Sequence, residues 1–436
     1  RRAGGGVLRV SGEPASPAPL PQYRPDAPAG AGDHDRAGAR DRFWRRLVAP
    51  LLDRVPTPFY LFSLVPIRAA LAELEAAFGA RPVRHWLSCK TQPLRPLLRW
   101  WCAAGRGIEV VSEFELKAAL AEGFPPERIL VNGPAKHVWL SRYPLRGLRV
   151  NFDSAAEVRA LLPLARRCQW CVGLRILTGI ERDPEYPNAP TQFGLDADEA
   201  LAVIRRLQRP GLRLEAVHFH LRTNVPSSHF YERALHEVAG LCRAAHFAPR
   251  FVDCGGGFPP PHVRTRGDRR LDAEFDLADM ARVADRAARL FPGMEELWLE
   301  NGRWLTARSG ALVVRVLDAK ERRGQRHLIC DGGKTLNALV ATWEKHDLLV
   351  LPRRRGPEVM TTVSGPTCMA FDQLARQPLP RALRPGDHVV WLDAGAYHLP
   401  WETRFSHGRA AICWHDGGET ALVRAREGFD RWWDWA

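Results

Sequence analysis

The sequence predicts an α/β fold, in which a parallel (β/α)8 barrel is followed by a second, mostly antiparallel β domain. Two observations lead to this prediction. Short apolar runs alternate with helical patterns eight times over about 220 residues, the size expected of such a barrel. After residue 303, apolar runs recur without long helices and are separated by Gly, Pro and Asp turns. An open, doubly wound sheet is the main alternative to the barrel.

Each element follows from its hydrophobic pattern. A strand at 57–62 comes first, followed by a helix whose apolar face is Ile67, Leu71, Leu74 and Phe78. The barrel strands are expected at 83–88, 107–111, 129–131, 148–152, 170–176, 213–219, 250–254 and 296–300, with helices at 113–122, 154–166, 197–207 and 229–245. The β-domain strands are expected at 311–317, 327–330, 358–364, 388–392 and 410–414.

The composition divides the chain into three parts. Residues 1–40 carry few large apolar side chains, so we expect a flexible leader. The barrel with its N-terminal lead-in then occupies 41–303, and the β domain 304–436. The Trp-rich tail at 429–436 is expected to pack on the β domain, and an interface patch is the alternative.

The charge pattern does not favour a nucleic-acid binder, although the formal net charge is +14. Only six of the 63 basic residues are Lys, and the Arg residues are dispersed along the chain. The nine cysteines show no regular framework, which is typical of reduced thiols in a cytoplasmic protein. No apolar run approaches the length of a membrane span.

Chemically active residues follow the predicted strands, where a barrel carries its active site. Glu300 ends the last barrel strand, and Arg303 follows it. An acid that can protonate a heteroaromatic nitrogen, beside a cation that can hold an anion, suits pyridoxal phosphate; an ordinary ion pair is the alternative. Lys90 follows the first barrel strand and supplies the primary amine that a Schiff base needs, which Arg cannot. A solvated surface lysine is the alternative.

Two further loops add candidate ligands. Gly255, Gly256 and Gly257 follow the seventh strand and offer unhindered backbone N–H groups to a phosphate, although a tight turn would explain a Gly triplet equally well. His218 and His220 alternate at the end of the sixth strand. We expect His220 to lie against a cofactor ring and His218 to lie in the core. No metal is expected, because no carboxylate or third ligand accompanies the two histidines at a suitable spacing.

Taken together, these residues resemble the fold type III pyridoxal phosphate-dependent decarboxylases, which include diaminopimelate and ornithine decarboxylases. The resemblance covers roughly residues 55–410, in the motif order of the family. It rests on Ser-Cys-Lys90-Thr-Gln, the 107–115 segment with Ser112 and Glu115, His218-x-His220, Asp253-x-Gly-Gly-Gly-Phe-Pro, Glu300-x-Gly302-Arg303, Gly365-Pro-Thr-Cys368-x-x-x-Asp372 and Asp393-x-Gly-Ala-Tyr397.

The resemblance implies an alanine-racemase-like barrel and a head-to-tail homodimer with shared active sites. By position, Lys90 would form the Schiff base and His220 would stack on the cofactor ring. Glu300 would pair with the pyridinium nitrogen, and Cys368 of the partner subunit would reprotonate the α-carbon. The remaining cofactor contacts would come from Ser112, Thr223, Gly255, Gly256, Gly257, Gly302, Arg303 and Tyr397.

The resemblance further implies α-decarboxylation of an amino acid. A racemase or epimerase on the same fold is the alternative. Glu300 argues against it, because the racemases of this fold type place Arg opposite the ring nitrogen and so have a poorer electron sink.

Three departures from the family bear on the substrate. Met369 follows Cys368, where ornithine and diaminopimelate decarboxylases carry an acid. No Arg lies at 337–342, where diaminopimelate decarboxylases carry one. Arg222-Thr223 replaces the usual Gly-Ser, although Arg222 could instead contact a phosphate or an internal carboxylate. We therefore expect an atypical amino acid or conjugate, with a distal anion or neutral group, as in specialised metabolism. The residues expected near it are Arg222, Met369 and Asp372.

Overall fold

The computed structural model describes residues 33–181, 191–208 and 214–434. These fall into two compact units. Of the described residues, those within 74–260 and 271–304 form the barrel unit, and those within 33–73, 261–270 and 305–434 form the β unit. Residues 1–32 of the predicted leader lie outside the described residues, whereas its last part belongs to helix α1 (Asp33–Val48).

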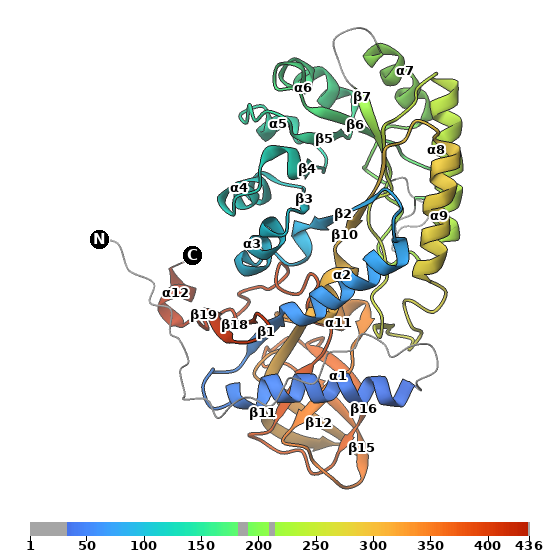
Figure 1. Cartoon of the computed structure of the whole chain (residues 1–436). Coiled ribbons are helices and arrows are strands. Elements are labelled where there is room, and N and C mark those ends of the chain that lie inside the picture. The colour runs from blue at the N-terminus through green and yellow to red at the C-terminus, as the bar shows by residue number, and fades with distance from the viewer. Residues whose placement is uncertain (1–32, 182–190, 209–213, 435–436) are drawn as a thin grey trace. The chain divides into compact units, whose positions relative to one another are not determined.

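Eight parallel strands close into a barrel in the order β10-β2-β3-β4-β5-β6-β7-β8 (Figure 1). β10 pairs with both β8 and β2 and so completes the ring. This confirms the predicted barrel, because a doubly wound sheet would keep two free edges. The strands are β2 (Val83–Ser88), β3 (Gly107–Val110), β4 (Ile129–Val131), β5 (Arg149–Phe152), β6 (Cys171–Arg175), β7 (Leu214–His218), β8 (Phe251–Asp253) and β10 (Glu296–Asn301).

Helices follow most of the barrel strands and surround the barrel (Figure 1). Polar side chains fix where several of them begin: Ser112 caps α4, Ser154 caps α6 and Asp196 caps α7, each by accepting a backbone N–H bond. The helices of the barrel unit are α3 (Arg95–Ala103), α4 (Glu113–Ala121), α5 (His137–Leu140), α6 (Ala155–Arg167), α7 (Ala197–Leu207), α8 (His229–Ala244) and α9 (Leu277–Leu290). Two more, α2 (Leu64–Phe78) and the short α10 (Arg303–Thr306), lie where the chain passes from one unit to the other.

Aromatic side chains fill the amino end of the barrel. Trp86, Phe251 and Trp298 are buried there in one apolar cluster. The Arg149 guanidinium lies 5.1 Å from the ring centre of Trp298 and 5.3 Å from that of Phe251, a cation–π arrangement. Packing at this end stabilises the barrel, and the opposite end is left for chemistry.

Nine strands form the sheet of the β unit, in the order β16-β15-β12-β11-β1-β18-β19, with β17 paired to β11 and β14. Only the β1/β18 and β12/β15 pairs are parallel among the described strands of this sheet, which confirms the predicted mostly antiparallel domain. Strands β14, β16 and β19 were not anticipated from the sequence. The strands are β1 (Phe59–Ser63), β11 (Gly310–Arg322), β12 (Gln325–Cys330), β14 (Leu348–Leu351), β15 (Glu358–Ser364), β16 (Gln373–Pro380), β17 (His388–Trp391), β18 (Ala411–His415) and β19 (Thr420–Arg424), beside a separate pair of β9 (Arg264–Thr265) and β13 (Glu344–Lys345).

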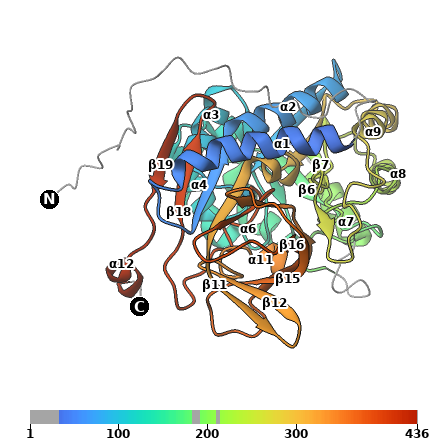
Figure 2. The ribbon, with the colours of Figure 1, turned by 90° about the horizontal axis from the view of Figure 1, so that it is seen from below.

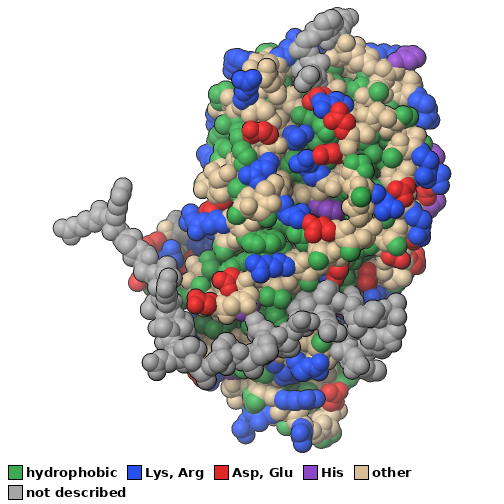
Figure 3. Space-filling view, in the orientation of Figure 1, with side chains coloured by type: hydrophobic (Ala, Val, Ile, Leu, Met, Phe, Trp, Pro, Cys, Tyr) green, Lys and Arg blue, Asp and Glu red, His purple; other side chains and the backbone are tan. Residues whose placement is uncertain are grey.

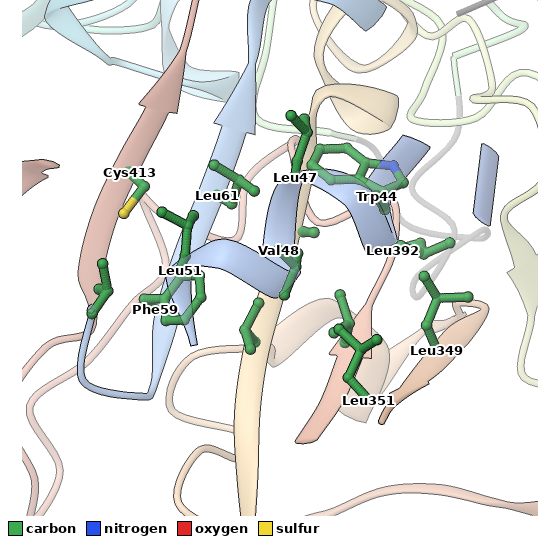
Figure 4. Packing of buried hydrophobic residues seen from close by; sticks show 14 of the residues in the cluster. Trp44, Leu47, Val48, Leu51, Phe59, Leu61, Leu349, Leu351, Leu392 and Cys413 are labelled. Atoms are coloured by element: carbon green, nitrogen blue, oxygen red, sulfur yellow. The ribbon is translucent and has the colours of Figure 1, made fainter. Parts of the chain in front are cut away.

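The lead-in segment differs from the sequence-based expectation. We expected it to belong to the barrel domain, whereas β1 is a central strand of the β sheet, with Phe59 opposite both Val313 of β11 and Ala411 of β18. All five residues of β1 are buried, as expected of a strand that is covered on both faces. Helix α1 supplies part of that cover, because Trp44 and Leu47 pack in one apolar cluster with β1, β11 and β17 (Figures 2 and 4).

The Trp-rich tail is only partly packed. Helix α12 (Phe429–Trp433) is tied to the β unit by Trp432, whose Nε1 donates to the Arg404 carbonyl at 2.9 Å. Phe429 and Trp433 remain 68% and 61% exposed, and residues 435–436 lie outside the described residues.

The basic side chains are spread over the face seen in Figure 3 and are interspersed with acids. Among the described helices, none is both long enough and apolar enough to span a bilayer.

Candidate active site

Polar side chains gather at the carboxyl end of the barrel. Because parallel barrel strands end at one rim, residues at the ends of different strands meet there. Each barrel strand has a polar residue near or just beyond its carboxyl end. These residues are Lys90 (β2), Glu109 (β3), Asn132 (β4), Asn151 (β5), Arg175 (β6), His218 (β7), Asp253 (β8) and Glu300 (β10).

Lys90 presents its amine at this rim. It lies in the short helical turn Cys89–Thr91 that follows β2. The Lys90 Nζ donates to both carboxylate oxygens of Glu109, at 2.8 and 3.0 Å. Gly302 packs against the same turn, where a Cβ would lie only 2.2 Å from the Thr91 side chain. Glu109, which the sequence analysis did not single out, therefore holds the amine, and Gly302 makes room for the turn.

Two buried amides connect the acids of the site. Asn132 Nδ2 donates to Glu300 Oε1 at 2.5 Å and reaches Glu109 Oε1 at 3.3 Å. Asn151 Nδ2 donates to Asn132 Oδ1 at 3.0 Å and to Asp253 Oδ2 at 2.9 Å. The orientation of Glu300 is thus fixed by a chain of hydrogen bonds that crosses the barrel.

His218 lies beside this network. Its Nδ1 lies 3.0 Å from Asp253 Oδ2 and 3.6 Å from Glu300 Oε1. The sequence spacing gave no sign of carboxylates beside His218, and barrel closure brings both of them there. Burial lowers the pKa of His218 to about 4.

The two neighbouring acids are shifted toward their protonated forms. Burial raises the pKa of Asp253 to about 7. Burial, followed by the charge of Asp253, raises the pKa of Glu300 well above its ordinary value. Both shifts favour the protonated acid, so this pair of carboxyl groups favours a bound proton.

The glycine loop packs against both His220 and Glu300. A Cβ at Gly255 would lie 2.7 Å from His220 Nδ1, and one at Gly256 would lie 2.4 Å from the Glu300 carbonyl oxygen. Gly257 has a φ of +106°, which L side chains rarely adopt. The Gly256 N–H donates to His220 Nδ1 at 3.3 Å. Burial lowers the pKa of His220 well below its ordinary value, so the ring is neutral, as suits stacking.

Arg222 and Thr223 lie beside this loop. The Arg222 carbonyl oxygen would be 2.5 Å from a Cβ at Gly257, and the Val225 N–H donates to the Gly257 carbonyl at 2.8 Å. Thr223 is exposed and Arg222 is half-buried. The backbone of this segment thus lies against the glycine loop, and the Arg222 Nε donates to the Thr223 carbonyl at 3.3 Å. Arg303 is also half-buried, at the first position of α10.

The predicted residues of the β unit occupy two loops. Cys368 is exposed and Met369 half-buried in the loop between β15 and β16. Asp372 is buried, and its carboxylate accepts bonds from the Lys334 N–H at 2.6 Å and from the Thr367 hydroxyl at 2.6 Å. The structure therefore gives Asp372 a role in holding this loop, in contrast to the substrate contact expected from the sequence.

Tyr397 lies in the second loop, after β17. It has a φ of +66°, a conformation that is uncommon for residues other than glycine.

Ser112 and Glu115 form the start of α4. The Ser112 hydroxyl oxygen accepts the Glu115 N–H at 3.2 Å, and a Glu115 carboxylate oxygen accepts the Val111 N–H at 2.8 Å. The structure thus shows Ser112 as a helix cap, which leaves its hydroxyl proton able to serve a ligand.

Stability should depend on pH through Glu115. Burial, with a further contribution from the Glu109 charge, raises the pKa of Glu115 from 4.5 to about 7. Between these values the folded protein keeps a proton that the unfolded chain has lost, so the free energy of unfolding falls as pH rises. In Glu115→Gln, which cannot titrate at this position, we expect the free energy of unfolding to fall by up to about 3 kcal/mol less over this pH range than in the wild type.

Urea unfolding of both proteins at pH 4.5 and at pH 7.5 measures the effect. The expected result is that the variant gains stability relative to the wild type at the higher pH. Glu127→Gln, at an exposed position of the same unit, serves as the control. Parallel pH profiles for wild type and Glu115→Gln would contradict the expectation.

The donor set at the rim fits pyridoxal phosphate. Lys90 offers an amine for the aldehyde, Glu300 an acid for the ring nitrogen, and His220 a neutral ring for stacking. The glycine loop has no room for side chains, so its backbone can approach a phosphate closely, although the Gly255 and Gly256 N–H groups donate to Asp253 and His220.

Comparison with known families decides the matter. Residues 64–307 match the model of the pyridoxal-binding domain of pyridoxal-dependent decarboxylases, which is more than half of the chain. The chain belongs to this family. The decarboxylase is 34% identical, over 82% of each chain, to diaminopimelate decarboxylase of Actinosynnema pretiosum subsp. auranticum. It is 31% identical to that of Deinococcus radiodurans, over 88% of this chain and 96% of the relative.

Solved structures share the fold of the decarboxylase. Diaminopimelate decarboxylase of Helicobacter pylori, complexed with L-lysine, has a TM-score of 0.77 at 23% identity, over 89% of this chain and 98% of that chain. Lysine/ornithine decarboxylase of Vibrio vulnificus, complexed with cadaverine, has a TM-score of 0.71 at 20% identity, over 84% and 96%. The predicted family, enzyme class and cofactor are thus confirmed: the protein is a pyridoxal phosphate-dependent amino-acid decarboxylase.

Proposed function

We propose that the decarboxylase removes the α-carboxylate of an amino acid bound at the carboxyl end of its own barrel. The observation that carries the proposal is that the Lys90 amine and the Glu300 carboxyl belong to one hydrogen-bonded network, through Glu109 and Asn132. When bound, pyridoxal phosphate supplies an aldehyde for the amine and a ring that accepts the electrons of the broken bond.

Lys90 supplies the amine, and Glu109 binds it and exchanges a proton with it. The Glu109 carboxylate, which is buried, accepts two bonds from Lys90 and so holds its Nζ at the rim. Covalent attachment requires an uncharged amine. Glu109 is in place to take the proton that Lys90 must lose, and to return it when the amine is released.

Glu300 is proposed to protonate the ring nitrogen. Asn132 fixes the Glu300 carboxyl, and the protonated form favoured by burial provides the proton that a pyridine nitrogen requires. A ring nitrogen kept protonated by an acid makes a strong electron sink, which favours decarboxylation over racemisation. A half-buried, neutral His220 at the glycine loop would cover one face of the ring.

We further propose that the enzyme works as a homodimer. In that arrangement, Cys368 of the partner subunit donates a proton to the α-carbon after the loss of CO2, and Tyr397 contacts the cofactor phosphate. The exposed position of Cys368 in its loop supports this role, since a thiol must be accessible to serve a second chain. All nine cysteines are free thiols, which supports a cytoplasmic location.

The substrate is proposed to be an atypical amino acid or conjugate of specialised metabolism. Met369 offers no charge to the distal ammonium of lysine or ornithine, and helix α11 (Ala338–Thr342) carries no Arg for a distal carboxylate. Arg222, half-buried beside the glycine loop, instead provides a cation on the barrel unit. Diaminopimelate is the second candidate, because the relatives named above bear its name.

A substrate panel tests this proposal. CO2 release should be measured with diaminopimelate, lysine, ornithine, 2-aminoadipate and N-acetyl-lysine. We expect kcat/KM for 2-aminoadipate or N-acetyl-lysine to exceed that of the other three by at least about 10-fold, the value of one charged hydrogen bond. If 2-aminoadipate is preferred, Arg222→Gln should lower its kcat/KM and leave that of N-acetyl-lysine unchanged. Efficient turnover of diaminopimelate would overturn the proposal and assign the activity named for the relatives.

A further inference from the structure

A second cluster of ligating side chains lies in the β unit. Glu344, His346 and His398 are buried, with 4%, 1% and 1% of their surfaces exposed. Each offers one donor atom, and these atoms all lie within 4.8 Å of one another. None of the three belongs to the barrel network.

Hydrogen bonding fixes the tautomer of His346. Its Nδ1 lies 2.8 Å from the Leu392 carbonyl oxygen, and since a carbonyl only accepts, Nδ1 carries the proton. The neutral ring then presents the lone pair of Nε2, which lies 2.8 Å from Glu344 Oε2. Two acceptors face each other, so a cation must lie between them. That cation is either a proton or a metal ion.

The third side chain favours a metal ion. A proton can bridge only two acceptor atoms, whereas three side chains of this cluster point their donor atoms toward one another. The His398 ring lies edge-on to that of His346, with centroids 5.3 Å apart and planes at 80°. In a tetrahedral zinc site with bonds of about 2.1 Å, ligand atoms are roughly 3.4 Å apart. Small side-chain movements would bring the three donor atoms to that spacing.

We propose that Glu344, His346 and His398 form a binding site for a divalent transition metal such as Zn2+. The bond from His346 Nδ1 to the Leu392 carbonyl is the outer contact that metal-bound histidines commonly make. Two imidazoles and one carboxylate form a donor set suited to zinc, because all three are borderline or hard ligands.

The surrounding charges agree with this assignment. Arg40 is buried and pairs with Asp347 and, at 3.0 Å, with Asp393. These two acids adjoin His346 and Leu392 in sequence, and Asp347 also pairs with Arg264, so two guanidinium groups face the two acids. Glu344 supplies the one carboxylate of the cluster, which a divalent ion would bind through its charge.

The site would anchor the loop that carries Tyr397. Leu392 begins this loop and His398 follows Tyr397 directly, so a bound ion would fix the loop at both ends. The ion is thus structural, and it acts on a segment with the uncommon backbone geometry noted above.

Metal content of the holoenzyme tests the proposal. The purified enzyme is incubated with Zn2+, and unbound zinc is removed by desalting. Elemental analysis by inductively coupled plasma mass spectrometry should then find about one zinc per chain. Glu344→Gln and His398→Gln should each lose most of it, while His327→Gln, a control on β12 of the same unit, should keep it. His218→Gln should also keep it, which separates this site from the barrel acids.

Co2+ in place of zinc adds a readout that is independent of activity. The wild type should show visible absorption bands of tetrahedral Co2+, and His398→Gln should lose them. Circular dichroism establishes that each variant is folded. Equal zinc contents in the wild type and in folded Glu344→Gln and His398→Gln, or no zinc in any of them, would overturn the proposal and leave an imidazolium–carboxylate pair.

Discussion

Lys90→Ala should lower kcat by at least about 10³-fold, because the variant loses both the covalent attachment point and the amine that exchanges with substrate. The side chain ends at the barrel rim, where it pairs with Glu109, so its loss should leave the fold intact. Steady-state CO2 release and thermal unfolding, measured together, separate the chemical effect from a folding effect.

Two controls sharpen this result. Lys117→Ala removes an exposed lysine of α4 that pairs with Glu113, and its activity should stay within about twofold of the wild type. Added methylamine should restore part of the activity of Lys90→Ala, because a small amine can occupy the space of the lost side chain. Wild-type turnover by Lys90→Ala would remove Lys90 from the chemistry.

Glu300→Gln should lower kcat by about 10²- to 10³-fold, the effect of removing one preorganised electrostatic group. Glutamine keeps the oxygen that accepts from Asn132 but cannot give a proton to the ring nitrogen. Since burial already favours the neutral acid, the variant should unfold at a temperature close to that of the wild type. The expected signature is therefore a large loss of rate without a loss of stability.

Glu296→Gln is the matched control, at the start of the same strand. Glu296 pairs with Arg84 at 2.6 Å and accepts from Trp298 Nε1 at 2.9 Å, both at the amino end of the barrel. Its substitution should affect stability more than rate. Equal effects of the two substitutions on kcat would contradict the role assigned to Glu300.

The position of some candidate residues at the barrel rim could be predicted from the sequence. Lys90 and Glu300 each follow an apolar run that had to be a strand, and their side chains are of the type that the cofactor needs. The glycine triplet was equally visible. The order of strands and helices was enough to predict the barrel, because eight repeats leave few other ways to bury the apolar runs.

The hydrogen-bonded network could not be predicted, because it depends on barrel closure. Asn132, Asn151 and Asp253 lie far apart in sequence and meet only when β4, β5 and β8 end at one rim. One signal was present: each is a polar residue at the end of an apolar strand. The sequence also could not predict that β1 belongs to the β sheet, because an apolar strand such as Phe59–Ser63 does not show which sheet it joins.

The central claim is that the amine of Lys90 binds the cofactor covalently. Reduction of the holoenzyme with borohydride, followed by proteolysis and mass spectrometry, tests it most directly. The account predicts a pyridoxyl phosphate mass on the peptide that contains Lys90, and none on the five other lysines of the sequence. A label on another lysine, or an active holoenzyme that takes up no label, would contradict it.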